Sequence, residues 1–206
     1  EAKSFTIFGS VYDTDFNLLE EASVSIFSED TLISMTDTDF DGNYVFDGLH
    51  VGNFDVISTK FNYDTSSATI SLTNQNNITE RNFYLTPNPG AVLGEVLINN
   101  LSIYQGYSVN INYGTVKLTN VTTSQILENS LSSTNYLYEF TDLNAAIYEL
   151  TIDVEIEVMF NNSYYETITF TDQKNIELGI AENYEYNFEY SFNADAVNLS
   201  GLIQMQ

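Results

Sequence analysis

Apolar and polar residues alternate one by one along much of the chain, and this alternation limits the fold more than any other feature of the sequence. In residues 152–158, four β-branched aliphatic side chains are separated by three acidic ones. Successive side chains of a strand point to opposite faces of a sheet, so the pattern predicts strands with one buried and one solvated face. The same rhythm recurs at 22–26, 68–72 and 184–192, and no segment shows comparable helical periodicity. The sequence therefore predicts an all-β fold.

The length and the proline pattern favour two small domains. The 206 residues are 43% hydrophobic and include 15 Tyr and 14 Phe, which supplies enough apolar area for packed cores. The chain has two prolines, Pro87 and Pro89, and Gly90 follows them. Each proline lacks a backbone donor and biases the residue before it toward extended structure, so this segment is the predicted linker.

The halves on either side of this linker share five short motifs in the same order. The matching segments are 8–11 with 93–96, 22–26 with 114–118, 43–49 with 138–143, 53–56 with 147–150, and 81–84 with 186–189. Collinear repetition of this kind indicates a duplicated domain. We therefore predict two tandem β-sandwiches, at residues 1–87 and 88–192.

The last residues, 193–206, repeat the opening motif a third time, at Val197, Leu199, Gly201 and Ile203. We expect them to form an orphan strand, which either begins a third repeat or is donated to a neighbouring molecule. A donated strand would satisfy the unpaired backbone groups at the edge of the neighbour's sheet.

The charge of the chain excludes several kinds of partner. It has 29 acidic and 5 basic residues, which gives a formal net charge of −24. Such a charge repels nucleic acids and anionic membrane surfaces, so we expect no nucleic-acid partner. No apolar stretch approaches the roughly 18–20 residues that span a bilayer, so no membrane insertion within this chain is expected. The chain has no cysteine, so disulfides and thiolate chemistry are excluded. The negative charge suits a saline or cation-rich extracellular environment, where ions screen the repulsion between acidic side chains.

The first half carries a spaced set of glycines, acidic turns and β-branched residues. In order, these are Gly9-x-Val11, Asp13, 22–26, Thr36-Asp37 with 41–44, and 52–56. This order resembles the carboxypeptidase regulatory-like domain, a transthyretin-like (prealbumin-like) seven-stranded β-sandwich of Ig-like form that is related to the repeat domains of bacterial surface adhesins. The resemblance implies a cell-surface protein and specifies a fold more than a function.

The elements of this resemblance also have physical roles. Asp41-Gly42 predicts a tight hairpin, because Gly adopts a positive φ at little cost, and Gly52 is expected to do the same before the next strand. The aromatic and aliphatic residues beside these turns are expected to fill the core. They are Tyr44, Phe46, Phe54 and Val56.

Surface relatives of this fold sometimes carry an isopeptide crosslink from an inward-facing lysine on the first strand. In this chain the inward positions are expected to be Val11 and Val96. The lysines lie elsewhere, at Lys3, Lys60, Lys117 and Lys174, so we expect no crosslink.

Three alternating aspartates ahead of a glycine match the first half of a calcium loop, which needs oxygen ligands at alternate positions and a sharp turn. They are Asp37, Asp39 and Asp41. Gly48 stands where such a loop needs a bidentate Glu, so a neighbouring loop would have to complete the site. The natural donors there are Asp13 and Asp15, with Asp47 a weaker candidate. The other interpretation is an acidic β-turn that keeps the surface polar.

His50 is the only histidine, so a multi-histidine metal site cannot form and a Ser-His-Asp triad has at most one centre. It lies in a predicted turn between Leu49 and Val51. Most acidic residues alternate with core residues and therefore point to solvent, so no carboxylate pair stands out. We expect no catalytic residues, no cofactor apart from calcium, and no enzymatic activity.

Five Asn-x-Ser/Thr sequons are candidate glycosylation sites in an exported protein. They are Asn77, Asn100, Asn120, Asn161 and Asn198. About as many are expected by chance from the Asn, Ser and Thr content, so their number does not itself indicate a glycoprotein.

Two hypotheses of function follow. Repetition without a catalytic site favours an extracellular structural subunit or module of a surface assembly, such as a filament, an S-layer-like coat or an adhesin stalk, that associates with itself or with neighbouring surface-protein domains. The alternative is a carbohydrate- or ligand-binding accessory module of a secreted protein. Its candidate sugar-stacking residues are Tyr164, Tyr165, Tyr184, Tyr186 and Tyr190, of which alternation places about half in the core.

Overall fold

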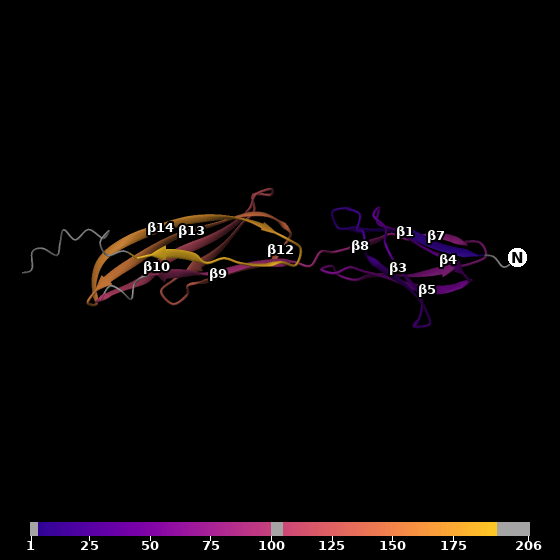
Figure 1. Cartoon of the computed structure of the whole chain (residues 1–206), viewed down its shortest axis with the longest axis horizontal. Coiled ribbons are helices and arrows are strands. Elements are labelled where there is room, and N and C mark those ends of the chain that lie inside the picture. The colour runs from indigo at the N-terminus through magenta and orange to yellow at the C-terminus, as the bar shows by residue number, and fades with distance from the viewer. Residues whose placement is uncertain (1–3, 100–104, 193–206) are drawn as a thin grey trace, which may run out of the picture. The chain divides into compact units, whose positions relative to one another are not determined.

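The computed structural model describes residues 4–99 and 105–192. These residues form strands and no helix, arranged as two β-sandwiches, so the predicted all-β fold is confirmed (Figure 1). The chain divides after Asn88 into two compact units. Unit 1 comprises residues 1–88 and unit 2 comprises residues 89–206.

Unit 1 is built around its first strand. Its strands are β1 (Phe5–Asp13), β2 (Ser23–Ser28), β3 (Thr31–Asp37), β4 (Asn43–Leu49), β5 (Gly52–Thr59), β6 (Ser66–Leu72), β7 (Ile78–Glu80) and β8 (Phe83–Leu85). One sheet has the order β4-β1-β7, and β8 also pairs with β1. β4 runs antiparallel to β1, whereas β7 and β8 run parallel to it. The other sheet has the antiparallel order β3-β2-β5-β6.

Unit 2 repeats this topology strand for strand. Its strands are β9 (Gly90–Asn99), β10 (Tyr107–Asn120), β11 (Ile126–Leu131), β12 (Leu137–Leu143), β13 (Ala146–Phe160), β14 (Ser163–Leu178), β15 (Asn183–Glu185) and β16 (Phe188–Ser191). The sheets are β12-β9-β15, with β16 also on β9, and β11-β10-β13-β14. Each strand of unit 1 therefore has its counterpart eight strands later, and the five sequence motifs fall on corresponding strands.

Each unit encloses its own core, made by the inward-facing positions of both sheets. The residues predicted for the core of unit 1 are buried, as are the four aliphatic residues of the alternating stretch on β13. Period-two alternation places these side chains on one face, where burying each of them contributes roughly 1.5–3 kcal/mol. The inward positions expected at Val11 and Val96 are also buried.

The second sheet of unit 2 extends well beyond its counterpart in unit 1. β10, β13 and β14 have 14, 15 and 16 residues, and they stay paired as far as Tyr107 opposite Phe160. A second small cluster around Val158 and Phe192 fills the sandwich at this end. The long strands are visible in Figure 1 as the extended ribbons of unit 2.

Two of the predicted turns differ from expectation. Gly42 has the predicted positive φ of 68°, but the turn links β3 and β4 of different sheets, so it does not close a hairpin. Gly52 begins β5 without a positive φ, and the left-handed residue of this region is Gly48, with φ of 74°. Asp142, the counterpart of Gly48 in unit 2, has a φ of 57°. The bend before the fifth strand of each unit therefore needs the left-handed conformation at this earlier position.

The predicted orphan strand, residues 193–206 with Val197, Leu199, Gly201 and Ile203, lies outside the described residues. Within the described part of the chain, no helix is long and apolar enough to cross a membrane.

Candidate functional site

The last strands of unit 1 run parallel to β1 and are interrupted beside a glycine. β7 pairs with Thr6–Phe8 and β8 with Val11–Asp13, and Arg81, in the link between them, lies against Gly9. A Cβ atom on Gly9 would clash with the backbone carbonyl oxygen of Arg81, so only glycine fits. This link interrupts the strand pairing at Arg81 and Asn82 and leaves backbone groups that need side-chain partners.

Two side chains satisfy these groups. The Tyr44 hydroxyl donates to the carbonyl oxygen of Arg81 at 2.7 Å. The amide N–H of Ser10 donates to Asn82 Oδ1 at 2.8 Å. Burial raises the pKa of Tyr44 although the charge of Arg81 lowers it, so the hydroxyl keeps its proton and remains a donor.

Unit 2 contains the same arrangement. A Cβ atom on Gly94 would clash with the carbonyl oxygen of Tyr186, and the Tyr138 hydroxyl donates to that oxygen. The amide N–H of Glu95 donates to Asn187 Oδ1 at 2.9 Å. Burial is also the main cause of the raised pKa of Tyr138. The Gly-Tyr-Asn arrangement is therefore a structural device that both copies have kept.

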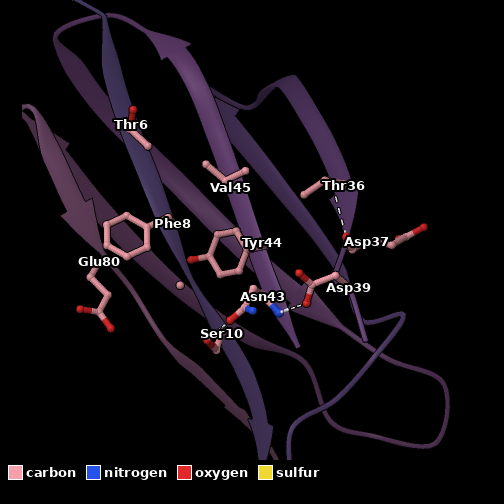
Figure 2. Close-up of a pocket in the computed structure, with 11 residues that line it drawn as sticks. Thr6, Phe8, Ser10, Thr36, Asp37, Asp39, Asn43, Tyr44, Val45 and Glu80 are labelled. Carbon is pink, nitrogen blue, oxygen red and sulfur yellow. Dashed lines mark hydrogen bonds between the residues drawn. The ribbon is translucent and has the colours of Figure 1, made fainter. Parts of the chain in front are cut away.

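Beside this device, the outer face of the β4-β1-β7 sheet holds a shallow groove of about 610 Å³ (Figure 2). Phe8 on β1 and Val45 on β4 are paired in register and lie in the groove, 38% and 52% exposed. Glu80 on β7 lies on one side, and Asp37 and Asp39 lie on the other. The groove thus has an apolar floor and acidic sides.

A groove of about 370 Å³ lies at the corresponding place in unit 2. Its lining residues are Leu93, Gly94, Glu95, Leu137, Tyr138, Glu139, Glu185 and Asn187. Leu93 corresponds to Phe8 and Glu185 to Glu80, so the apolar floor and the acidic side recur. Sequence reasoning missed both grooves, although the repeated Phe8-Gly9 and Leu93-Gly94 motif marks their position.

Two of the five aspartates predicted to bind calcium, Asp13 and Asp39, cap turns. Asp39 Oδ1 accepts the amide N–H groups of Asp41 and Asn43, at 3.0 and 2.8 Å. Asp13 Oδ1 likewise accepts those of Asp15 and Asn17, at 2.9 and 2.8 Å. These are the bonds of Asx-type turns, in which a carboxylate caps its own loop.

No group of three or more His, Asp or Glu side chains that could hold a metal ion occurs among residues 4–99 and 105–192. Asp37 and Asp39 lie together at the groove, and Asp13 caps the loop that contains Asp15, but the structure gives no shared site for these residues with Asp41. Calcium binding therefore has no support from the geometry.

His50 is exposed between β4 and β5, where a turn residue was predicted. The lysines within the described residues also have local roles. Lys60 Nζ donates to the carbonyl oxygen of Glu20 at 2.6 Å, Lys117 pairs with Glu128 at 2.9 Å, and Lys174 lies 5.4 Å from the centre of the Tyr186 ring.

Three of the five sequons lie in the described part of the chain, and Asn100 and Asn198 lie outside it. Asn77 precedes β7, Asn120 ends β10, and Asn161 lies in the turn between β13 and β14. Glycosylation at any of them stays a prediction.

The tyrosines predicted as a sugar platform mostly pack inward. Tyr184, Tyr186 and Tyr190 are partly buried against the core of unit 2, whereas Tyr164 is 61% exposed. The side chain of Tyr165 lies outside the described part of the structure, and the other four do not form a continuous exposed surface.

An exposed aromatic cluster does exist in unit 1, where it was not predicted. Tyr12 and Tyr84 stack with ring centres 5.4 Å apart, and Phe16 meets Tyr84 edge-on at 5.7 Å. Phe16 is 72% exposed and has a φ of 64°, a left-handed conformation that is unfavourable for a bulky residue. The sequence feature that could have indicated this cluster is Phe16, a large apolar residue in a turn that also contains Asp13 and Asp15.

The fold and the repeated Gly-Tyr-Asn arrangement define the chain as a tandem of two β-sandwiches with the same strand topology. Residues 6–86, which make up most of unit 1, match the Carboxypeptidase regulatory-like domain family. No curated protein sequence matches the chain.

Solved structures share the fold at low identity. The chain is similar to the Bacillus anthracis TIE protein, with 10% identity, a TM-score of 0.51, and coverage of 91% of this chain and 34% of that chain. It therefore spans about a third of the length of that protein. It is also similar to a streptococcal ancillary pilin (12% identity, TM-score 0.39, 90% of this chain and 62% of that chain). BcpA, the major pilin subunit of Bacillus cereus, has 12% identity, a TM-score of 0.39, and coverage of 85% and 69%. At these identities the likeness concerns the fold.

Proposed function

We propose that the chain is a non-enzymatic, extracellular structural module of a surface assembly, such as a filament, a coat or an adhesin stalk. The observation that carries this proposal is the strand-for-strand repetition of one sandwich in two units. A duplicated scaffold that keeps its structural device in both copies, while most of the surrounding sequence diverges, serves well as a spacer.

The charge of the chain limits where copies can touch. With a net charge of −24, most surfaces of two copies repel each other, and contacts form best where charge is absent. The edge strands β3, from Thr31 to Thr36, and β6 carry no charged residue. Their counterparts in unit 2 are charged, β11 by Glu128 and β14 by residues such as Asp172 and Lys174. The β3-β2-β5-β6 sheet is therefore the better acceptor of an added strand.

Residues 197–203 supply the donor in this proposal. The segment 196–206 contains no charged residue and alternates apolar with polar side chains at its start. Such a segment pairs with an uncharged edge without electrostatic cost, and the backbone hydrogen bonds supply the affinity.

Deleting residues 193–206 tests the proposal. We expect the truncated chain to fold but to lose assembly, as measured by electron microscopy and light scattering. A synthetic peptide of residues 193–206 should inhibit assembly of the full chain, and a scrambled peptide should not. Normal assembly of the truncated chain would contradict the strand-addition mechanism.

The aromatic cluster favours a second candidate function, binding of a neutral sugar. Exposed rings held rigidly by a capped turn offer a flat apolar face to a pyranose ring, and the nearby Asp15 and Asn17 carry hydrogen-bonding groups. A glycan array with the wild-type chain and with Phe16→Ala tests this function. Binding that survives the substitution would exclude this cluster as the site.

A further inference from the structure

We propose that the groove on the outer face of each unit binds an extended, basic segment of a partner protein in which aliphatic residues alternate with lysine or arginine. The chain then has two equivalent docking sites, one at Phe8 and Glu80 and one at Leu93 and Glu185. This interaction is separate from the contact between copies and does not depend on it.

The recurrence of the groove supports a binding role. The close approach of Arg81 and Tyr186 explains why Gly9 and Gly94 are kept, but it does not require a large apolar residue before each glycine. Phe8 lies on the outer face and is 38% exposed, so the core does not need it. An apolar floor retained in two diverged copies points to a ligand that covers it.

The charge on the groove selects the kind of partner. The groove of unit 1 is flanked by Asp37 and Glu80, and three glutamates line the groove of unit 2. These glutamates are Glu95, Glu139 and Glu185. Carboxylates beside an apolar floor complement cationic side chains that alternate with aliphatic ones.

Within the described residues, no basic side chain forms an ion pair with these carboxylates. Among residues 4–99 and 105–192, the one ion pair joins Lys117 to Glu128, and Lys60 bonds to a backbone carbonyl. Arg81 and Lys174 lie over aromatic rings. A second copy, with 5 basic residues against 29 acidic ones, complements the groove poorly, so the occupant is a different protein.

The strands beside the grooves suit an extended occupant. β4 pairs with β1 and β12 pairs with β9, and in the described part of the chain each is the edge strand of its sheet. A segment that lies along such an edge can pair with its backbone and place alternate side chains over the groove.

A titration with a fluorescent seven-residue peptide of alternating lysine and leucine tests the proposal, at about 0.15 M salt to screen long-range attraction. We expect two equivalent sites per chain. Glu80→Lys and Glu185→Lys should each reduce the number of sites from two to one, and the double variant should weaken binding about tenfold or more.

Matched variants separate the groove from the overall charge. Glu29→Lys and Glu177→Lys make the same change in net charge at exposed positions outside the grooves. They should keep both sites, and circular dichroism should show that all variants fold. If the two control variants weaken binding as much as the groove variants, the attraction is non-specific and the proposal is wrong.

Two further ligands test the apolar part. A peptide with serine in place of leucine should bind at least about fivefold more weakly, because it leaves the floor uncovered. Spermidine should not compete at equal charge concentration. Equal binding of the serine peptide, or effective competition by spermidine, would show that charge alone is recognised and would overturn the proposal.

Discussion

The hydroxyl of Tyr44 on β4 and the backbone carbonyl of Arg81, in the link between β7 and β8, are joined by a hydrogen bond of 2.7 Å across β1. This bond is possible because the intervening residue is Gly9, whose missing side chain lets the link approach. Tyr138 and Tyr186 are related in the same way in unit 2. The stability of each unit should therefore depend on a small number of residues that can be tested one at a time.

Replacing either tyrosine removes the bond and keeps the ring. We expect Tyr44→Phe to lower the free energy of unfolding of unit 1 by about 1–2 kcal/mol, because a partly buried carbonyl loses its partner. Tyr138→Phe should do the same in unit 2. Urea denaturation measures both, and a loss below about 0.3 kcal/mol in both variants would show that water replaces the hydroxyl.

Adding one methyl group at Gly9 should be more damaging. Gly9→Ala places a Cβ atom against the carbonyl oxygen of Arg81, and we expect a loss of at least about 2–3 kcal/mol. Gly48→Ala is the matched control, because Gly48 has a φ of 74° and open space around it. It should lose only about 1 kcal/mol, from backbone strain alone. Thermal unfolding distinguishes the two, and equal losses would contradict the steric argument.

Asn82 and Asn187, in the links between the last two strands of each unit, should matter more than an exposed asparagine. In Asn82→Ala and Asn187→Ala, the amide N–H groups of Ser10 and Glu95 lose their acceptors. We expect each substitution to cost about 1–2 kcal/mol of unfolding free energy. Asn53 bonds a serine hydroxyl at the surface, so Asn53→Ala should cost less than about 0.5 kcal/mol. A similar cost for all three would mean that the hydrogen bonds of Asn82 and Asn187 contribute no more than a surface bond.

Alkaline pH should destabilise both units. Burial raises the pKa of Tyr44 and Tyr138 above the ordinary value of 10.0, so above that pH the unfolded chain releases protons that the folded chain retains. The free energy of unfolding should therefore be constant with respect to these groups below pH 10 and should fall as the pH rises above it. A double variant with Phe at both positions should lose part of this fall in urea titrations at pH 8 and pH 11. An unchanged fall would assign the effect to other groups.

At position 16, a glycine variant should be more stable than an alanine variant, which is the reverse of their usual order of stability. The φ of 64° at this position is unfavourable for any residue with a Cβ atom, so Phe16→Gly should be about 1 kcal/mol more stable than Phe16→Ala. Chemical denaturation of the two variants checks this difference. Both lack the ring, so both should lose any binding of sugar to the aromatic cluster. A less stable glycine variant would show that the turn rearranges.

The sequence was a good guide to the strands because alternation and burial have the same physical cause. The aliphatic residues of 152–158 and the aromatic pair Tyr44 and Phe46 are buried as predicted. The turn at Gly42 shows the limit of local reasoning. A tight turn can be identified from Asp41-Gly42, but which sheet receives the next strand depends on long-range pairing, here between β4 and β1.

The candidate site was harder to predict for a related reason. Alternating aspartates suit a calcium loop and an Asx turn equally well, and the structure uses Asp39 and Asp13 to cap their own loops. The groove depends on side chains from strands far apart in sequence, such as Phe8 and Glu80, which become neighbours only through parallel pairing. The repeated glycine was visible in the sequence, but the residues that lie beside it on other strands were not.

The parallel pairing of the first strand with the last strands has a mechanical consequence. In each unit, β1 or β9 enters the fold and β8 or β16 leaves it, and the two run side by side in the same direction. Tension along the chain therefore pulls these strands past each other lengthwise. Their hydrogen bonds are loaded in shear and must break together, whereas an antiparallel end pair would open one bond at a time. A stalk or filament built from such units would resist stretching without a covalent crosslink. The lysine that such a crosslink needs is replaced by Val11 in unit 1 and by Val96 in unit 2.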